Sequence, residues 1–172
     1  MLFLAFACSK DDDSSTNGSN DFFENHRNKI WVLAYTDTFS NTSTNYYTGF
    51  SNGSYNSARF GEDGAYYCDK LFIGTKNNLY DEELDNVFGD GAGVNIIIAI
   101  IENKANELKI EIIYTSLDSS IIYTETYLFL VNGDNLISTK NVNGRLEEPI
   151  TSKIYNGNLN INFDSCYTHY GF

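Results

Sequence analysis

The feature that most constrains this fold is the alternation of apolar and polar residues along many short segments. In the segment 107–114, Leu108, Ile110 and Ile112 alternate with charged residues. Successive side chains of a β-strand point to opposite faces, so this pattern predicts a strand with one buried face. Similar patterns predict further strands at 30–38, 58–74 (two strands), 94–101, 121–131, 136–142, 150–155 and 158–164.

Tight-turn sequences separate these segments. They are Glu62-Asp63-Gly64, the stretch 132–135, Asn143-Gly144 and Asn156-Gly157, of which Asn-Gly is the strongest hairpin signal. Only 21–28 and 80–88 have a helical pattern, and both are short. We therefore predict an all-β domain of about 8–10 antiparallel strands. An up-and-down barrel closes such a meander most simply, and a two-sheet β-sandwich is the alternative.

The first twenty residues differ in composition from the rest of the chain. An apolar run with small residues at Ala5 and Ala7 leads directly to Cys8, as at a signal-peptide cleavage site. Residues 9–20 are polar and acidic, a composition typical of a solvated spacer. We therefore divide the chain into a signal peptide (1–7), a cysteine and flexible acidic spacer (8–20), and one β domain (21–172).

The run Cys8-Ser9-Lys10-Asp11-Asp12 resembles the start of mature lipoproteins from Bacteroidetes-type bacteria. The resemblance implies that Cys8 carries the lipid and that the acidic residues after it direct export. The expected location is the outer membrane of a Gram-negative bacterium, at the cell surface, with the lipid as membrane anchor. A cytosolic protein with an apolar start and an acidic patch is the alternative.

The three cysteines are Cys8, Cys68 and Cys166. With Cys8 committed to lipid, export would place the remaining pair in an oxidising compartment, which favours a Cys68–Cys166 disulfide. Two buried free thiols are the alternative. We expect no metal site, because no closely spaced Cys or Cys/His motif is present.

The domain also resembles lipocalin-like bacterial lipoproteins. The resemblance is carried by a short N-terminal helix, by Trp31 in the first strand, by the hairpin sequence 60–64 and by the late meander. It implies a lipocalin-like barrel with Trp31 in the core near one end.

Charge and motifs exclude several functions. The formal net charge is −12, and only −2 comes from the first twenty residues, so the domain itself is acidic and nucleic acid is an unexpected partner. The two histidines, His26 and His169, stand outside any catalytic or metal-binding motif. We therefore expect no cofactor and assign no catalytic residue.

The segment 40–57 suggests a binding site. Its 18 residues are five Ser, four Asn, three Thr, three Tyr, two Gly and one Phe, without a charge. Rigid aromatic rings among small polar side chains are typical of adaptable binding loops. We predict that Tyr46, Tyr47, Phe50 and Tyr55 contact a ligand near one end of the barrel. The alternative is an ordinary strand with a Ser/Asn-rich lead-in.

Two functions are compatible with these features. The first is a non-catalytic, lipid-anchored surface protein that binds a glycan or a small apolar ligand. The second is a small secreted hydrolase with paired carboxylates, which would need two acidic side chains in one cleft.

Overall fold

The computed structural model of the chain describes residues 20–37, 42–51, 53–61, 64–72, 76–79, 95–116, 120–163 and 166–169. Cys8, the predicted spacer before residue 20 and the predicted helix 80–88 lie outside this part. The helix and strands are α1 (Phe22–His26), β1 (Ile30–Asp37), β2 (Thr42–Ser51), β3 (Ser54–Phe60), β4 (Tyr66–Phe72), β5 (Lys76–Leu79), β6 (Asn95–Lys104), β7 (Glu107–Thr115), β8 (Ile121–Asn132), β9 (Asn135–Val142), β10 (Arg145–Leu146), β11 (Ile150–Ile154) and β12 (Tyr167–His169).

The twelve described strands form one hydrogen-bonded sheet in the order β12-β4-β3-β2-β1-β11-β9-β8-β7-β6-β5, with β10 paired to β9. All neighbours are antiparallel except β12, which runs parallel to β4. The prediction of an all-β, mostly antiparallel domain is therefore confirmed. The strand number exceeds 8–10 because β10 and β12 have only two and three residues, too few to leave an alternating pattern.

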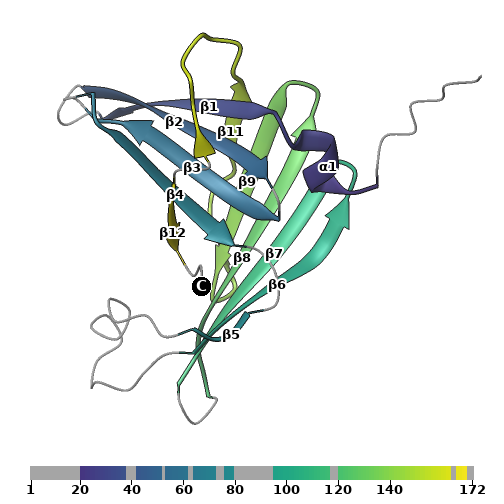
Figure 1. Cartoon of the computed structure of the whole chain (residues 1–172). Coiled ribbons are helices and arrows are strands. Elements are labelled where there is room, and N and C mark those ends of the chain that lie inside the picture. The colour runs from purple at the N-terminus through teal and green to yellow at the C-terminus, as the bar shows by residue number, and fades with distance from the viewer. Residues whose placement is uncertain are drawn as a thin grey trace, which may run out of the picture.

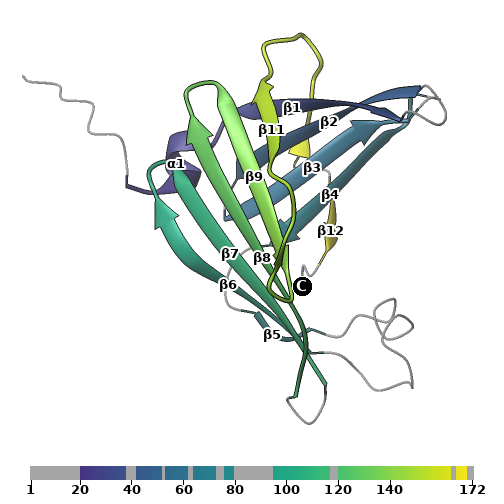
Figure 2. The same cartoon turned by 180° about the vertical axis from the view of Figure 1, so that it is seen from behind.

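The sheet curls so that two groups of strands face each other, with β11 between them (Figures 1 and 2). We call β1–β4 the aromatic half and β6–β9 the aliphatic half. Within the described residues, the hydrogen-bonded path ends at β12 and β5, which do not pair with each other. The predicted meander is thus present as a curled sheet with two ends rather than as a closed barrel. Both end strands are short, so neither offers enough backbone hydrogen bonds to close the sheet into a barrel.

The space between the two halves is filled by apolar side chains. Phe129 of β8 contacts two rings of the aromatic half, with ring centroids 5.1 Å from Phe50 and 5.0 Å from Tyr55. Trp31 is fully buried in the same cluster, as the sequence predicts. Together these contacts make the two halves one hydrophobic core.

The helix α1 covers one end of this core (Figure 1). Asp21 caps the helix by accepting a hydrogen bond from the Glu24 amide at 3.1 Å. Phe22, Phe23 and His26 are buried, and the Phe22 ring lies 4.9 Å from Phe50. The short helix predicted at 21–28 is therefore confirmed, and it packs on the strands through its two phenylalanines.

Two of the predicted hairpin turns show the backbone conformation that their sequences favour. Asn143 and Gly144 both have positive φ, 48° and 84°, as a type I′ turn between β9 and β10 requires. Gly133, with φ 58°, lies in the tight connection between β8 and β9.

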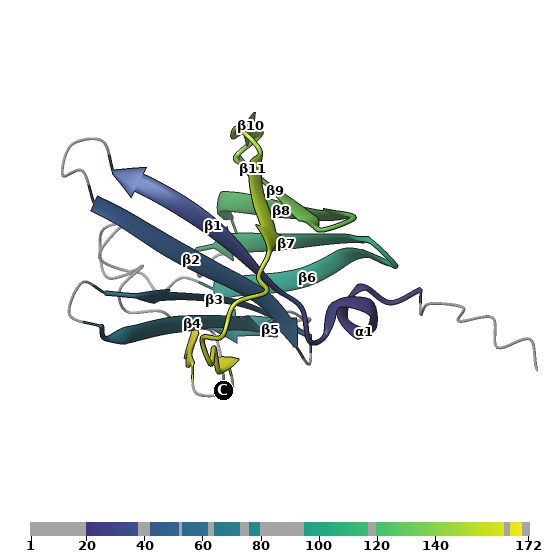
Figure 3. The same cartoon turned by 90° about the horizontal axis from the view of Figure 1, so that it is seen from above.

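The prediction of a hairpin at Asn156-Gly157 followed by a strand at 158–164 is wrong. Residues 155–163, which we call the strap, leave the sheet after Tyr155, whose amide still donates to the Ile30 carbonyl at 2.7 Å, and cross the outer face of the aromatic half without forming a strand (Figure 3). Phe163 packs directly on Gly49, where an added Cβ would overlap its ring. The apolar residues alternate here because one side of an extended segment lies against a sheet, which requires no pairing.

The end of the strap is fastened to β4. The Tyr66 hydroxyl donates to the Asn162 carbonyl at 3.0 Å, and a disulfide joins Cys68 to Cys166 with 4.7 Å between the Cα atoms. The predicted disulfide is present, and its Cα distance is typical of such bonds.

Candidate functional site

The four aromatic residues predicted to bind ligand do not lie together. The segment 42–57 is a β-hairpin rather than a loop, so the alternative of an ordinary strand is the one observed. Alternation then sends Tyr46 and Phe50 to the inner face, and Tyr47 to the outer face. A common site made by all four rings is therefore incompatible with the hairpin.

Phe50 and Tyr55 belong to the core. Phe50 is 1% exposed and packs on Phe22 and Phe129, and Tyr55 packs against the same cluster. Burial raises the pKa of the Tyr55 hydroxyl, and a hydrogen bond with Thr48 opposes the shift. Their rings join the two halves, so these two predicted ligand contacts lie in the packed core rather than on an exposed surface.

Tyr47 is covered on the outer face. It is 3% exposed, with its ring centroid 5.2 Å from Tyr155 of the strap and 6.0 Å from Phe60. It borders two shallow clefts of about 340 and 400 Å³ beside the strap, one of which also includes Leu159. Tyr47 therefore lies beneath the strap, and only a ligand that enters these clefts would approach it.

Tyr46 is partly buried and lies further along the inner face than Phe50 and Tyr55. The pairing register places Leu33, Tyr46, Arg59 and Tyr67 in one row across β1, β2, β3 and β4. This row shares the inner face with Trp31 and Phe50, but lies further from α1. It therefore continues the core face beyond the region that the aliphatic half covers.

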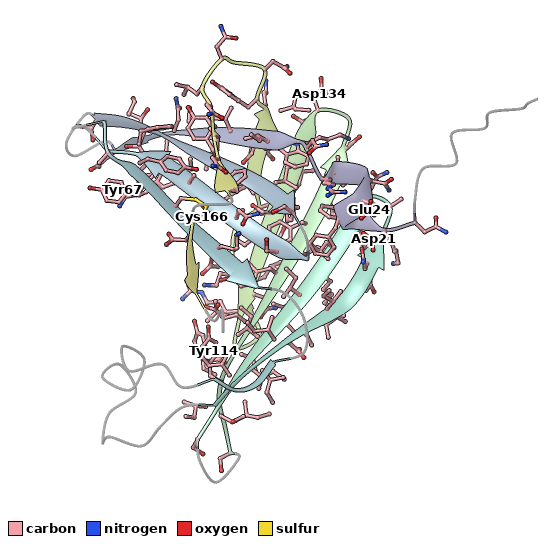
Figure 4. All side chains as sticks on the ribbon, viewed as in Figure 1. Asp21, Glu24, Tyr67, Tyr114, Asp134 and Cys166 are labelled. Carbon is pink, nitrogen blue, oxygen red and sulfur yellow. A yellow bond between two sulfur atoms is a disulfide. The ribbon has the colours of Figure 1, made fainter. Side chains whose placement is uncertain are left out.

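We call Tyr35, Tyr46, Arg59 and Tyr67 the tyrosine platform. The rings of Tyr35 and Tyr46 meet edge to face at 6.4 Å, and the Arg59 guanidinium carbon lies 5.1 Å from the centre of the Tyr67 ring. Tyr35 and Tyr67 are 54% and 48% exposed, and Figure 4 shows Tyr67 toward the free end of the aromatic half. The platform thus offers aromatic rings and a cation to solvent on one rigid sheet.

Three platform residues were not predicted. Tyr35 belongs to the same alternating set as Trp31, and the hairpin turn at Gly64 places Tyr67 opposite Arg59. If residues are paired across the β3–β4 hairpin, starting from that turn, Tyr67 comes to lie opposite Arg59. No feature of the sequence shows which residues on the inner face of the aromatic half are buried by the aliphatic half and which are left exposed.

A second polar group lies on the inner face of the aliphatic half. The carboxylate of Glu125, a residue 8% exposed, accepts from Tyr123 at 3.0 Å and from Tyr127 at 2.9 Å, and lies 2.6 Å from the Lys140 ammonium. Burial first, and then the Glu125 carboxylate, raise the pKa of Tyr123, so its hydroxyl stays a donor at neutral pH.

The contacts of Glu125 decide what this group can do. Both carboxylate oxygens have partners, and the charge is matched by Lys140, as a buried acid requires. Within the described residues, no second carboxylate is buried beside it. The Glu125 carboxylate is therefore engaged by one ammonium and two hydroxyl groups.

In the part of the chain that the structure describes, no three His, Cys, Asp or Glu side chains gather as a metal site would need. None of the helices in the same part is long and apolar enough to span a membrane. Comparison of the chain with protein-family models, curated proteins and solved structures gives no match.

Proposed function

We propose that this chain is a non-catalytic binding protein that holds a carbohydrate on the tyrosine platform. Lipid at Cys8 would anchor it in the outer membrane, with the domain displayed at the cell surface. The observation that carries the proposal is the row formed by the partly buried Tyr46 and the exposed Arg59 and Tyr67, with the exposed Tyr35 beside it.

The chemistry of the platform suits a sugar better than a wholly apolar ligand. Tyrosine presents a flat apolar ring together with a hydroxyl, so it contacts the C–H face of a sugar ring and bonds its hydroxyl groups. Arg59 adds donors in a fixed plane, and Ser57 and Asp69 lie in the neighbouring row nearer the core. A small apolar ligand would desolvate the tyrosine hydroxyls and the Arg59 guanidinium without offering them hydrogen bonds, which costs affinity.

The hydrolase alternative has less support. It requires an acid and a base on either side of a scissile bond, whereas Glu125 is engaged by Lys140 and two tyrosines. The platform itself has Arg59 as its charged side chain, and a guanidinium does not exchange protons near neutral pH.

Binding of the soluble domain, residues 21–172, to a glycan array tests the carbohydrate proposal. The double variant Tyr46→Ala/Tyr67→Ala should lose the signal while its thermal melting temperature stays nearly unchanged. The control Ile121→Ala/Leu146→Ala removes two side chains that are each 67% exposed elsewhere, and should bind as the wild type does. Equal binding by all three proteins, or no glycan bound by the wild type, would contradict the proposal.

The anchor is tested separately. A labelled fatty acid fed to cells expressing the full chain should enter the wild type and not Cys8→Ala. Equal incorporation into both proteins would remove the lipid from the proposal and leave the platform untouched.

A further inference from the structure

A cleft with two cations lies at the other end of the aromatic half, on its outer side. Arg27, Asn28 and Lys29 line one side where α1 leads into β1, and Ile161, Asn162 and Phe163 of the strap line the other. We call these six residues the α1–strap cleft. Its volume is about 360 Å³, within the range of small-ligand sites.

Among the described residues, no carboxylate is paired with the positive charge of the cleft. Neither Arg27 nor Lys29 forms an ion pair with a carboxylate in the described part of the chain. The chain as a whole has a formal charge of −12, so two neighbouring cations with no carboxylate partner among the described residues contrast with its overall acidic composition. Such a local reversal of charge attracts anions that the rest of the protein repels.

His26 holds one of these cations in place. The Nζ of Lys29 lies 3.2 Å from Nδ1 of His26, whose Nε2 lies 3.1 Å from the carbonyl oxygen of Ala105. A neutral ring that donates from Nε2 can accept the Lys29 ammonium at Nδ1. Burial first, and then the Lys29 charge, lower the pKa of His26, which keeps the ring neutral. A neutral partner orients the ammonium without cancelling its charge.

We propose that the α1–strap cleft binds one oxyanion, a carboxylate or a phosphate, carried on a compact ring or headgroup. Arg27 and Lys29 face the anion, and the amide of Asn28 supplies a further hydrogen bond. Ile161 and Phe163 contact the apolar face of the ring. This site is independent of the tyrosine platform, which lies on the opposite face of the same strands.

Two sources carry this chemistry: a soluble acidic sugar or phosphate ester, and an anionic lipid headgroup. Both present one oxyanion next to an apolar body. They differ in whether the anion is held at a membrane surface, and the experiment separates them on that basis.

Nuclear magnetic resonance titration of the soluble domain tests the site. The probes are inorganic phosphate, glucuronate and, as the uncharged counterpart, glucose, all at constant ionic strength. Phosphate and glucuronate should shift the amide signals of 27–30 and 161–163, and glucose should not. In Arg27→Gln/Lys29→Gln the affinity should fall roughly tenfold for each cation removed.

A matched variant separates a specific site from general charge effects. Lys109→Gln/Arg145→Gln removes the same charge from the aliphatic half and β10, and should bind both anions like the wild type. Co-sedimentation with vesicles of phosphatidylglycerol, compared with phosphatidylcholine, then identifies the source. If the wild type sediments with the anionic vesicles and Arg27→Gln/Lys29→Gln does not, the ligand is a lipid headgroup. If the wild type does not sediment with them, the ligand is a soluble anion.

The proposal is overturned if the shifts are spread over many lysines and arginines, or if they persist in Arg27→Gln/Lys29→Gln. It is also overturned if glucose gives the same shifts as glucuronate, because the anion would then contribute nothing. Each of these results leaves the tyrosine platform untested, so the two proposals fail separately.

Discussion

The aromatic and aliphatic halves of the sheet have the same number of strands and the same antiparallel pairing, yet their inner faces differ. The aliphatic half presents isoleucine and leucine along most of the length of β6 and β7, all nearly fully buried: Ile96, Ile98, Leu108, Ile110 and Ile112. The aromatic half changes character along each strand. Phe50 and Tyr55 are packed near α1, and Tyr35 and Tyr67 are half exposed at the far end.

The difference shows that the exposure of a strand face depends on the elements that pack against it as well as on its own residues. Beside the core row of Phe50 and Tyr55, the aromatic half has Thr48, Ser57 and Asp69, and beyond them Tyr46, Arg59 and Tyr67. Small polar residues thus separate a buried region from a half-exposed region on one continuous face. The inner face of the aromatic half is buried near α1 and open to solvent at its far end, where we propose that a ligand binds.

Phe129→Ala should cause the largest loss of stability. Its ring joins the halves by contacting Phe50 and Tyr55, and truncating a buried phenylalanine costs about 3–5 kcal/mol. Urea unfolding followed by circular dichroism measures the change. The control Leu128→Ala, on the outer face of the same strand, should lose clearly less; equal losses would contradict a core shared by both halves.

Removing the disulfide should cause the next largest loss of stability, and its local effect should lie in the aromatic half. The cysteines Cys68 and Cys166 are 98 residues apart, so Cys68→Ser/Cys166→Ser frees a long loop in the unfolded chain. A loss of about 2–4 kcal/mol is typical of such bonds. Hydrogen exchange should then rise throughout the sheet, because the halves share one core, and most strongly in the strap and β4, which the bond joins. An equal rise in the strap, β4 and β6–β8 would show that the bond does not fasten the strap locally.

Gly49→Ala should destabilise the contact between the strap and the aromatic half. The new methyl group would overlap the Phe163 ring, and overpacking of this kind costs about 1–3 kcal/mol. A double-mutant cycle with Phe163→Ala checks the cause, because removing the ring should relieve most of the penalty. Purely additive losses would show that Gly49 is needed for another reason.

His26 should make stability depend on pH at the α1 end of the core. Its pKa is lowered from the ordinary value near 6.5 in the folded protein, so below that pH the unfolded chain binds more protons. The free energy of unfolding should therefore fall as pH drops below about 6.5. Urea titrations of wild type and His26→Gln at pH 8 and pH 5 measure this. The advantage of the wild type should shrink at pH 5, and a constant difference would contradict a buried neutral histidine.

Much of the fold follows from local patterns in the sequence. Alternation at 107–114 and the Asn143-Gly144 turn predict strands and a hairpin that the structure contains, because these depend on neighbouring residues alone. The strap shows the limit. Its alternating residues 158–163 have the same pattern as a strand, and only the presence of Gly49 beneath Phe163 shows what they pack against.

The candidate site was predicted less well than the fold. Tyr46 and Phe50 are aromatic residues on the same face of β2, so the composition of the segment cannot show which of the two is more exposed. The distinction arises from Phe129 and α1, which are far away in sequence and cover only Phe50. The disulfide was predictable because it needed only a count of cysteines and an assumption about compartment.

Tyr67→Ala should have the smallest effect on stability and the clearest effect on recognition. The Tyr67 side chain is 48% exposed, and its ring packs against the Arg59 guanidinium. An exposed cation–π pair of this kind contributes about 0.5–1 kcal/mol. Tyr55→Ala, one strand away on the same inner face, removes a ring packed on Phe129 and should cost several times more. Thermal melting of both variants, paired with glycan binding by Tyr67→Ala, separates the covered end of the face from the open one. If Tyr67→Ala melts as low as Tyr55→Ala, the platform is packed surface and cannot serve as a contact region.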